Sequence, residues 1–206
     1  MPAKKKSVGS ERFVIILAGG KGERFWPLSR ESTPKQLLAL FGKKSFLQNT
    51  YERIKRLVPA KNIFVITSES QVAAIRKQLP KVSKDNVIGE PCGRDTCAAI
   101  TLAAALVGAR TTTGVMAILP SDHLIPAKGE KKFQKILEES FDLAARGQAI
   151  VTIGIKPNAP ETGYGYIQMG DRLPALKDRK AYKSAFHVAK RFTEKPYFDR
   201  AVHFLS

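Results

Sequence analysis

The chain has 206 residues, 43% of them apolar and 26% charged, which suits a soluble α/β domain with a full core. No apolar run is long enough to span a membrane, and the two cysteines are too few for a disulfide framework, so we expect a reducing cytoplasm and no membrane partner. The formal net charge of +17 favours polyanionic partners. Because the lysines are dispersed and no zinc-finger or RNA-recognition spacing occurs, small polyanions are favoured over nucleic acid.

Apolar patterning predicts strands that alternate with helices. Residues 1–11 read as a disordered basic tail, and the opening strand is expected at 13–18. Further strands are predicted at 63–67, 87–88, 115–119 and 149–155, and helices at 46–58, 69–79, 95–108 (capped by Asp95 or Thr96) and 133–147. From Pro157 the pattern changes to short strands at 164–169 and 186–192, followed by a helix at 197–205. The alternation predicts a single domain over 12–206, Rossmann-like, with a mixed, mostly parallel sheet and helices on both faces.

The opening strand breaks into a glycine loop that contains Gly19, Gly20 and Gly22. Arg24 and Lys35 bring positive charge to the same end of the strand. Backbone N–H groups freed by such a turn, together with two cations, are typical of a polyphosphate site. The loop therefore predicts binding of a nucleoside triphosphate. Neither the dinucleotide fingerprint nor the Walker motif fits, since Phe25 occupies the third glycine position of the first and the second lacks its glycine and Ser/Thr.

A carboxylate is expected to face this loop. Asp122 follows the strand at 115–119, and ligands of open α/β sheets bind beyond the carboxyl ends of the strands, where strand order reverses. A carboxylate and a triphosphate approach productively only with a divalent cation between them, and Mg²⁺ suits one or two carboxylates plus phosphate oxygens. Asp122 taken alone also fits a turn or cap residue, but its place after a strand favours a metal ligand.

Five segments together resemble a known family. LAGGKGERFWPLSR with the downstream PKQ is similar to the signature of the sugar-nucleotide pyrophosphorylases. The full set is most similar to the mannose-1-phosphate guanylyltransferase branch of that family, which implies the nucleotide-diphospho-sugar transferase fold. The matching segments are FWPLSR at 25–30, GEPCGRDT at 89–96, LPSDH at 119–123, ETGYGYI at 161–167 and FTEKP at 192–196.

The resemblance implies a reaction and a set of site residues. GTP and mannose 1-phosphate would give GDP-mannose and pyrophosphate by Mg²⁺-assisted in-line attack on the α-phosphate, with Arg24, Lys35 and Asp122 as the catalytic groups and Asp122 as the metal ligand. The implied nucleotide-binding residues are Leu17, Ala18, Gly19, Gly20, Gly22, Arg24, Glu90, Pro91, Arg94 and Asp122. The implied sugar-phosphate-binding residues are Gly163, Tyr164, Gly165, Glu194 and Lys195. A homodimer is left open.

Two departures from the family pattern leave alternatives open. Asp95 stands where the family usually has Asn, and Cys97-Ala98 replaces its usual Ala-Pro, which makes base specificity less secure. The family's second acidic metal ligand lies beyond Ser206, so we expect the amino-terminal portion of a longer enzyme. The alternatives are a related nucleotidyltransferase for another base or sugar, a non-catalytic nucleotide-binding fragment, and nucleic-acid binding through the positive charge.

Overall fold

The structure is a computed structural model that describes residues 11–20, 25–30, 33–147, 149–173, 182 and 184–205. The chain divides into two compact units, Met1–Ala149 and Ile150–Ser206, each described by itself. The predicted basic tail lies outside the described residues except for Glu11, whose carbonyl accepts a hydrogen bond from the N–H of Val115 (2.9 Å). Glu11 therefore belongs to the folded unit rather than to a tail. Across the described ranges, no helix combines the length and apolar character needed to cross a membrane.

The first unit alternates strands and helices as the sequence predicts. Its strands are β1 (Arg12–Leu17), β2 (Ile63–Ser68), β3 (Val87–Glu90) and β4 (Val115–Pro120). Its helices are α1 (Phe46–Ile54), α2 (Val72–Gln78), α3 (Asp95–Gly108) and α4 (Ala127–Gly147), with 3-10 turns η2 (Lys35–Leu37), η3 (Ala60–Asn62), η4 (Glu69–Gln71) and η5 (Lys84–Asn86). Helix α1 is set by a capping box, since Ser45 and Gln48 exchange side-chain and backbone hydrogen bonds.

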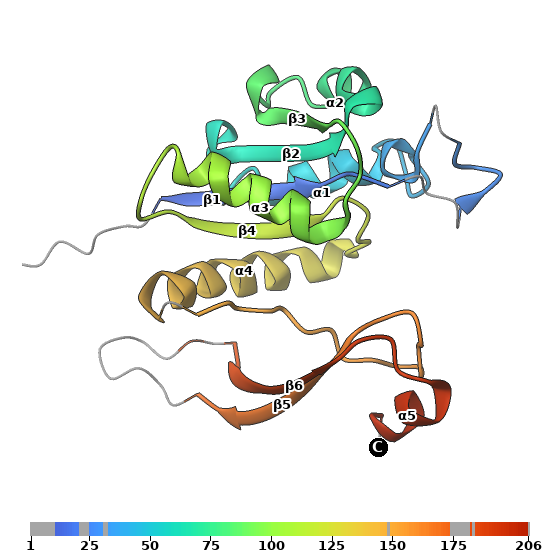
Figure 1. Cartoon of the computed structure of the whole chain (residues 1–206), viewed down its shortest axis with the longest axis vertical. Helices are drawn as coiled ribbons and strands as arrows, with labels where there is room; N and C mark the ends of the chain where they lie inside the picture. The colour runs from blue at the N-terminus through green and yellow to red at the C-terminus, as the bar shows by residue number, and fades with distance from the viewer. Residues whose placement is uncertain are drawn as a thin grey trace, which may run out of the picture. The chain divides into compact units, whose positions relative to one another are not determined.

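The four strands form one parallel sheet in the order β3-β2-β1-β4. Figure 1 shows β1 and β4 side by side in the sheet, with α3 crossing in front. The strand order reverses at β1, because β2 and β3 are added on one side of it and β4 on the other. Leu17 lies opposite Pro120 in the register, so β1 and β4 end at the same level. This is the switch point at which open α/β sheets bind their ligands.

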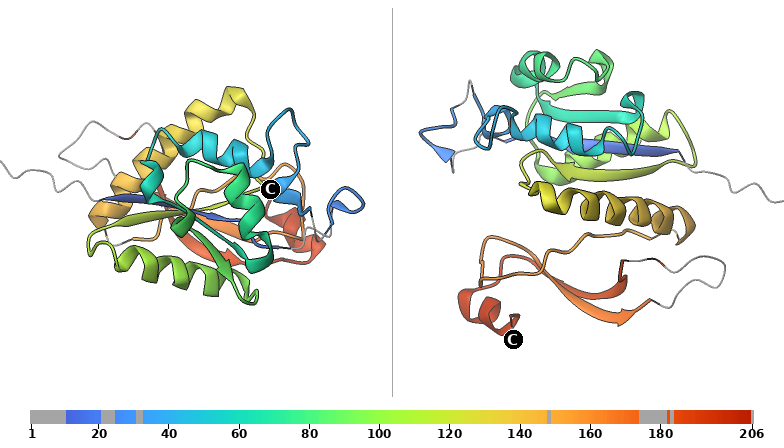
Figure 2. Two further views of the ribbon diagram at one scale, coloured as in Figure 1. Left: turned by 90° about the horizontal axis from the view of Figure 1, so that it is seen from above. Right: turned by 180° about the vertical axis from the view of Figure 1, so that it is seen from behind.

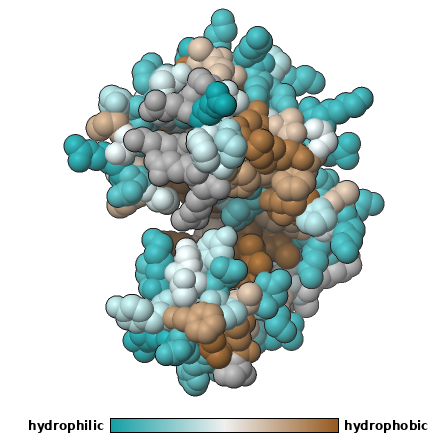
Figure 3. Space-filling model, turned by 90° about the vertical axis from the view of Figure 1, so that its right-hand side faces the viewer, coloured by the Kyte–Doolittle hydropathy of each residue, from teal (hydrophilic) through white to brown (hydrophobic). Residues whose placement is uncertain are grey.

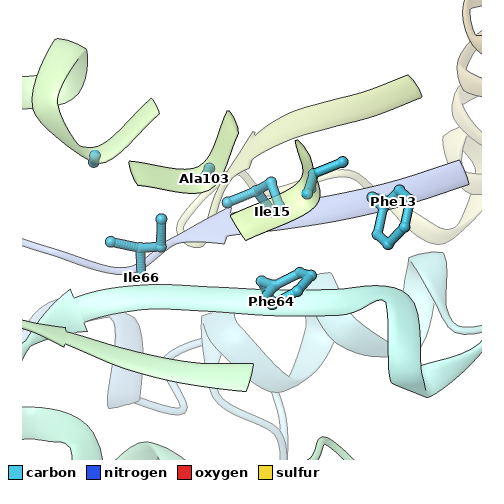
Figure 4. Close-up of a cluster of buried hydrophobic side chains, with 7 residues drawn as sticks. Phe13, Ile15, Phe64, Ile66 and Ala103 are labelled. Atoms are coloured by element: carbon cyan, nitrogen blue, oxygen red, sulfur yellow. The ribbon is translucent and has the colours of Figure 1, made fainter. Parts of the chain in front are cut away.

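Both faces of the sheet are buried. On one face Phe13, Ile15, Phe64 and Ile66 pack under Ala103 and its neighbours on α3, as Figure 4 shows. Alternation turns the remaining residues of β1 to the opposite face, where Figure 2 shows α1 and α4. Burying each large apolar side chain contributes about 1.5–3 kcal/mol before the entropy cost of ordering. The unbroken apolar sequence of β1 is explained by this two-sided burial.

The second unit is smaller. Its strands β5 (Tyr166–Arg172) and β6 (His187–Thr193) pair antiparallel, and helix α5 (Phe198–His203) follows them. Tyr166 lies opposite Thr193, so the residues just before β5 and just after β6 meet at one end of the pair.

Three sequence predictions of local structure were wrong. Residues 149–155 are not a strand: Ile150 and Ile155 are 98% and 78% exposed, and no described strand pairs with the segment. The caps predicted for α3 fail too: the N-cap position is Arg94, which makes no side-chain cap hydrogen bond, and Asp95 is the first residue of the helix, with a left-handed φ of +59°. Helix α4 begins at Ala127 rather than at 133, because residues 127–132 are small or charged and carry no apolar periodicity to mark them.

Candidate functional site

The glycine loop leaves the sheet from a backbone that is held on both sides. The N–H of Ala18 donates to the carbonyl of Ile66 (2.8 Å), which extends the β1–β2 ladder beyond β1. The carbonyl of Ala18 accepts from Gln36 Nε2 (2.7 Å) and from Thr67 Oγ1 (3.1 Å). Gly20 then adopts φ +121°, a backbone conformation that residues with a Cβ rarely adopt. The loop therefore starts from a fixed point and turns sharply away.

Lys35 and Asp122 meet beside this loop. The Lys35 ammonium forms an ion pair with the Asp122 carboxylate, and the two side chains are 26% and 25% exposed. The backbone that carries Asp122 is fixed by its neighbour Ser121, whose N–H donates to the carbonyl of Leu17 (3.0 Å) and whose carbonyl accepts from Thr50 Oγ1 (3.1 Å). The cation and the carboxylate that the sequence singled out are thus brought together at the ends of β1 and β4.

A second carboxylate lies at the same edge of the sheet. Glu90 ends β3, and its Oε2 lies 3.8 Å from the position that a Cβ on Gly19 would occupy. Pro91 and Arg94 follow it on an exposed segment that leads into α3. The structure therefore places Glu90 against the glycine loop, with Pro91 and Arg94 on the surface next to it in the chain.

The predicted sugar-phosphate residues belong to the second unit and cluster within it. Gly165 precedes β5 and lies against Glu194, since a Cβ added to it would stand 2.8 Å from Glu194 Oε2. Glu194 pairs with Lys195 (3.2 Å), and both side chains are exposed. Lys195 adopts φ +39°, and Tyr164 is also exposed. Two chain segments that are distant in sequence thus present a glycine, a carboxylate and an ammonium together.

The motif after the glycine loop forms surface rather than core. Trp26 is 77% exposed, and Leu28 and Phe41 are exposed as well. Phe25 and Phe41 contact Phe46 edge to face, with ring centroids 6.3 and 5.7 Å away. Figure 3, which views the right-hand side of Figure 1, shows hydrophobic side chains gathered on this unit's surface. Trp26 is therefore available for contacts outside the unit's own core, whereas Phe25 packs on the buried Phe46.

The donors at this edge fit a divalent cation that shares its coordination with phosphate. Asp122 supplies one carboxylate, and Mg²⁺ in nucleotide sites uses one or two carboxylates plus phosphate oxygens. In the part of the chain that the structure describes, no three His, Cys, Asp or Glu side chains form a metal-binding group.

Two of the predicted residues, Gly22 and Arg24, lie outside the described residues. Conversely, the motifs assigned no role to Gln36, Thr67 and Gln71, which the structure joins under the glycine loop. Gln36 follows the motif lysine and precedes the apolar Leu37–Leu38 pair. This short pattern does not mark Gln36 for burial, although a buried polar side chain is expected to have a hydrogen-bond partner.

Comparison with known proteins identifies the family of the chain. The family model described as nucleotidyl transferase matches residues 13–206. A mannose-1-phosphate guanylyltransferase from Salmonella muenchen is 40% identical over 95% of this chain and 40% of its own length. The corresponding protein from Klebsiella pneumoniae is 42% identical over 93% of this chain and 39% of its own length. The chain thus spans about two fifths of these curated relatives.

Solved structures support the same fold. One from Thermus thermophilus, named a mannose-1-phosphate geranyltransferase, superposes with a TM-score of 0.80 at 32% identity over 95% of this chain and 53% of its own. Another from Helicobacter pylori, named a mannose-6-phosphate isomerase, has a TM-score of 0.70 at 25% identity over 94% of this chain and 64% of its own. The activities in these two names differ, so the likeness carries the fold rather than the reaction. The family match over nearly the whole described chain means that this chain belongs to the nucleotidyl transferase family.

Proposed function

We propose that the chain is the nucleotide-binding part of a mannose-1-phosphate guanylyltransferase, which forms GDP-mannose and pyrophosphate from GTP and mannose 1-phosphate. The observation that carries the proposal is the meeting of Lys35 and Asp122 at the strand switch point, beside the Gly19-Gly20 loop. The names of the curated relatives supply the two substrates. A single catalytic domain over 12–206, in a cytoplasmic enzyme, is part of the same proposal.

The chain's own groups would bind and orient the triphosphate. Backbone N–H groups of Gly19 and Gly20 would donate to phosphate oxygens, and Lys35 would leave Asp122 to contact the reacting α-phosphate. Arg24 would add a second cation. Asp122, freed from Lys35, would hold Mg²⁺, which when bound neutralises phosphate charge and makes the α-phosphorus more electrophilic.

The remaining predicted residues divide between the base and the sugar phosphate. Glu90, Pro91 and Arg94 would contact the guanine, and the cluster of Gly163, Tyr164, Gly165, Glu194 and Lys195 would bind mannose 1-phosphate, with Lys195 on its phosphate. A phosphate monoester has its second pKa at about 6, so the attacking oxygen is already anionic near neutral pH and no general base is needed. The work left to the protein is positioning and charge neutralisation.

A pyrophosphate-release assay on the whole chain tests the proposal. Four nucleoside triphosphates are combined with mannose, glucose and galactose 1-phosphates, and Asp122→Asn serves as the inactive control. We expect GTP with mannose 1-phosphate to give the highest rate, and Mg²⁺ to be required.

Other outcomes separate the alternatives. A preference for another base or sugar would assign a related nucleotidyltransferase, and GTP binding without pyrophosphate release would assign a non-catalytic binding fragment. Failure to bind any triphosphate would overturn the proposal.

A further inference from the structure

We propose that Gln36 is a positioning residue for the nucleotide site: its buried amide holds the Ala18 carbonyl and so sets the direction from which the glycine loop presents its N–H groups to a triphosphate. The inference deepens the proposed function and rests on it. Its starting point is a side chain that is completely buried yet polar, in the turn directly after Lys35.

Both donors of the Gln36 amide are used. Nε2 lies 2.7 Å from the Ala18 carbonyl oxygen and 2.6 Å from Gln71 Oε1. Because a carbonyl oxygen only accepts, the amide can face Ala18 only with its nitrogen. The orientation of Gln36 is therefore fixed by the hydrogen-bonding chemistry of the backbone.

The neighbouring Thr67 cannot replace this donor. Its hydroxyl lies 3.1 Å from the Ala18 carbonyl and 3.3 Å from Gln71 Oε1, and it has a single hydrogen to share between them. Gln36 thus makes the shorter of the two hydrogen bonds to the loop's anchor, and its amide has a hydrogen for each acceptor. Through it the end of β1 is tied to η2 and to η4.

The oxygen of the Gln36 amide is less well satisfied than its nitrogen. Gln36 Oε1 is buried and has no hydrogen-bond partner within the described residues, which is an unfavourable arrangement. A methionine side chain of similar length would remove this unpaired acceptor, but it would leave the single hydrogen of Thr67 for both the Ala18 carbonyl and Gln71 Oε1. What the glutamine adds is two donors, one to the Ala18 carbonyl at the base of the loop and one to Gln71.

The turn that carries Gln36 also carries the cation of the site. Lys35 and Gln36 are consecutive in η2, one paired with Asp122 and the other bonded to Ala18. A single short turn therefore ties the backbone of Lys35 to the base of the loop. Losing the Gln36 bond would loosen this connection while leaving Lys35 and Asp122 in the protein.

The test compares Gln36→Met with Gln78→Met in the whole chain. Gln78 is a stringent control, because its Nε2 donates to a carbonyl of the same turn, that of Leu37 (3.2 Å), and its Oε1 accepts from Ser45, so its loss disturbs the turn without removing the bond to the Ala18 carbonyl. GTP binding with Mg²⁺ is measured by calorimetry, and thermal unfolding is measured alongside. We expect Gln36→Met to raise the Kd for GTP about tenfold, which corresponds to the upper end of the range for one lost neutral hydrogen bond. We expect Gln78→Met to change the Kd less than about twofold.

The outcomes are distinguishable. If the unaltered chain binds GTP and Gln36→Met binds it equally well, the inference is wrong while the proposed function stands. If both variants weaken GTP binding in proportion to their loss of unfolding temperature, Gln36 is merely structural and the inference is again wrong. If the unaltered chain does not bind GTP, the proposed function itself fails. Should Gln36→Met not fold, Gln36→Glu keeps the shape but places an acceptor against Ala18, and the same rise in Kd is expected.

Discussion

Breaking the ion pair between Lys35 and Asp122 should change the affinities for metal and for nucleotide in opposite directions. In the free protein the Lys35 ammonium neutralises the carboxylate that a divalent cation would need. Replacing Lys35 by methionine removes this competitor and keeps the length of the side chain. We therefore expect Lys35→Met to bind a divalent cation more tightly in the absence of nucleotide, and to bind GTP more weakly in its presence.

The size of both effects follows from the exposure of the pair. Exposed ion pairs contribute up to about 1 kcal/mol, and with both side chains only about a quarter exposed we take the upper end of that range. This corresponds to a metal affinity about fivefold higher in the variant. Loss of a contact between a cation and a phosphate oxygen costs about 1.5–3 kcal/mol, the range for a hydrogen bond to a charged group, which raises the Kd for GTP about tenfold to a hundredfold.

Electron paramagnetic resonance of Mn²⁺ measures the free-metal affinity, and a GTP titration in Mg²⁺ measures the second effect. Lys44→Met is the matched control, because Lys44 pairs with Glu52 (3.2 Å) away from the glycine loop. The control should leave both affinities unchanged. If Lys35→Met leaves Mn²⁺ binding unaltered or weakens it, the carboxylate of Asp122 is not the metal's ligand and the reasoning is refuted.

Two further predictions concern the scaffold. Gly89→Ala should lower the free energy of unfolding by about 1–3 kcal/mol in chemical denaturation, because the added Cβ would stand 2.9 Å from the Cα of Glu69. Gly93→Ala is the control, because no atom lies within 4 Å of the position of its added Cβ. Equal stability of the two variants would show that the predicted clash at Gly89 does not occur. The pKa of Glu52 lies below its ordinary value of 4.5, mainly because of the hydrogen bond from Lys55. The ionised carboxylate therefore stabilises the fold by about 0.5 kcal/mol. This stabilisation is present above pH 4.5 and is lost as the pH falls through the lowered pKa. Glu52→Gln should therefore reduce stability near neutral pH but match the unaltered chain in strong acid, at about pH 2. A gap that persisted in acid would show that the charge is not responsible.

Most of the sheet could be predicted from the sequence, because its strands are buried on both faces and read as apolar runs. The run at Phe13–Ile16 is fully buried and β2 nearly so, whereas β4, at the edge of the sheet, is also an apolar run but is mostly only partly buried. The same rule failed at residues 149–155, since an apolar run becomes a strand only if a partner pairs with it. Ile150 and Ile155 lie exposed instead.

The proximity of two candidate site residues was predicted correctly, and their roles stay predictions. Lys35 and Asp122 could be placed together because parallel strands deliver their carboxyl ends to one edge of the sheet, and adjacent β1 and β4 do so. Gln36 could not be assigned, because its role depends on contacts with Ala18 and Gln71, distant in the chain. Periodicity reports which residues are buried, but it does not report which polar groups meet there.

Crystals of the chain grown with GTP and Mn²⁺ would test the central claim most directly, because Mn²⁺ prefers oxygen ligands as Mg²⁺ does and its anomalous scattering locates it without ambiguity. The account predicts one Mn²⁺ bound to the Asp122 carboxylate and to phosphate oxygens, with the Lys35 ammonium moved from Asp122 onto the triphosphate and the phosphates lying over Gly19 and Gly20. A metal bound elsewhere while Lys35 and Asp122 remain paired would contradict it.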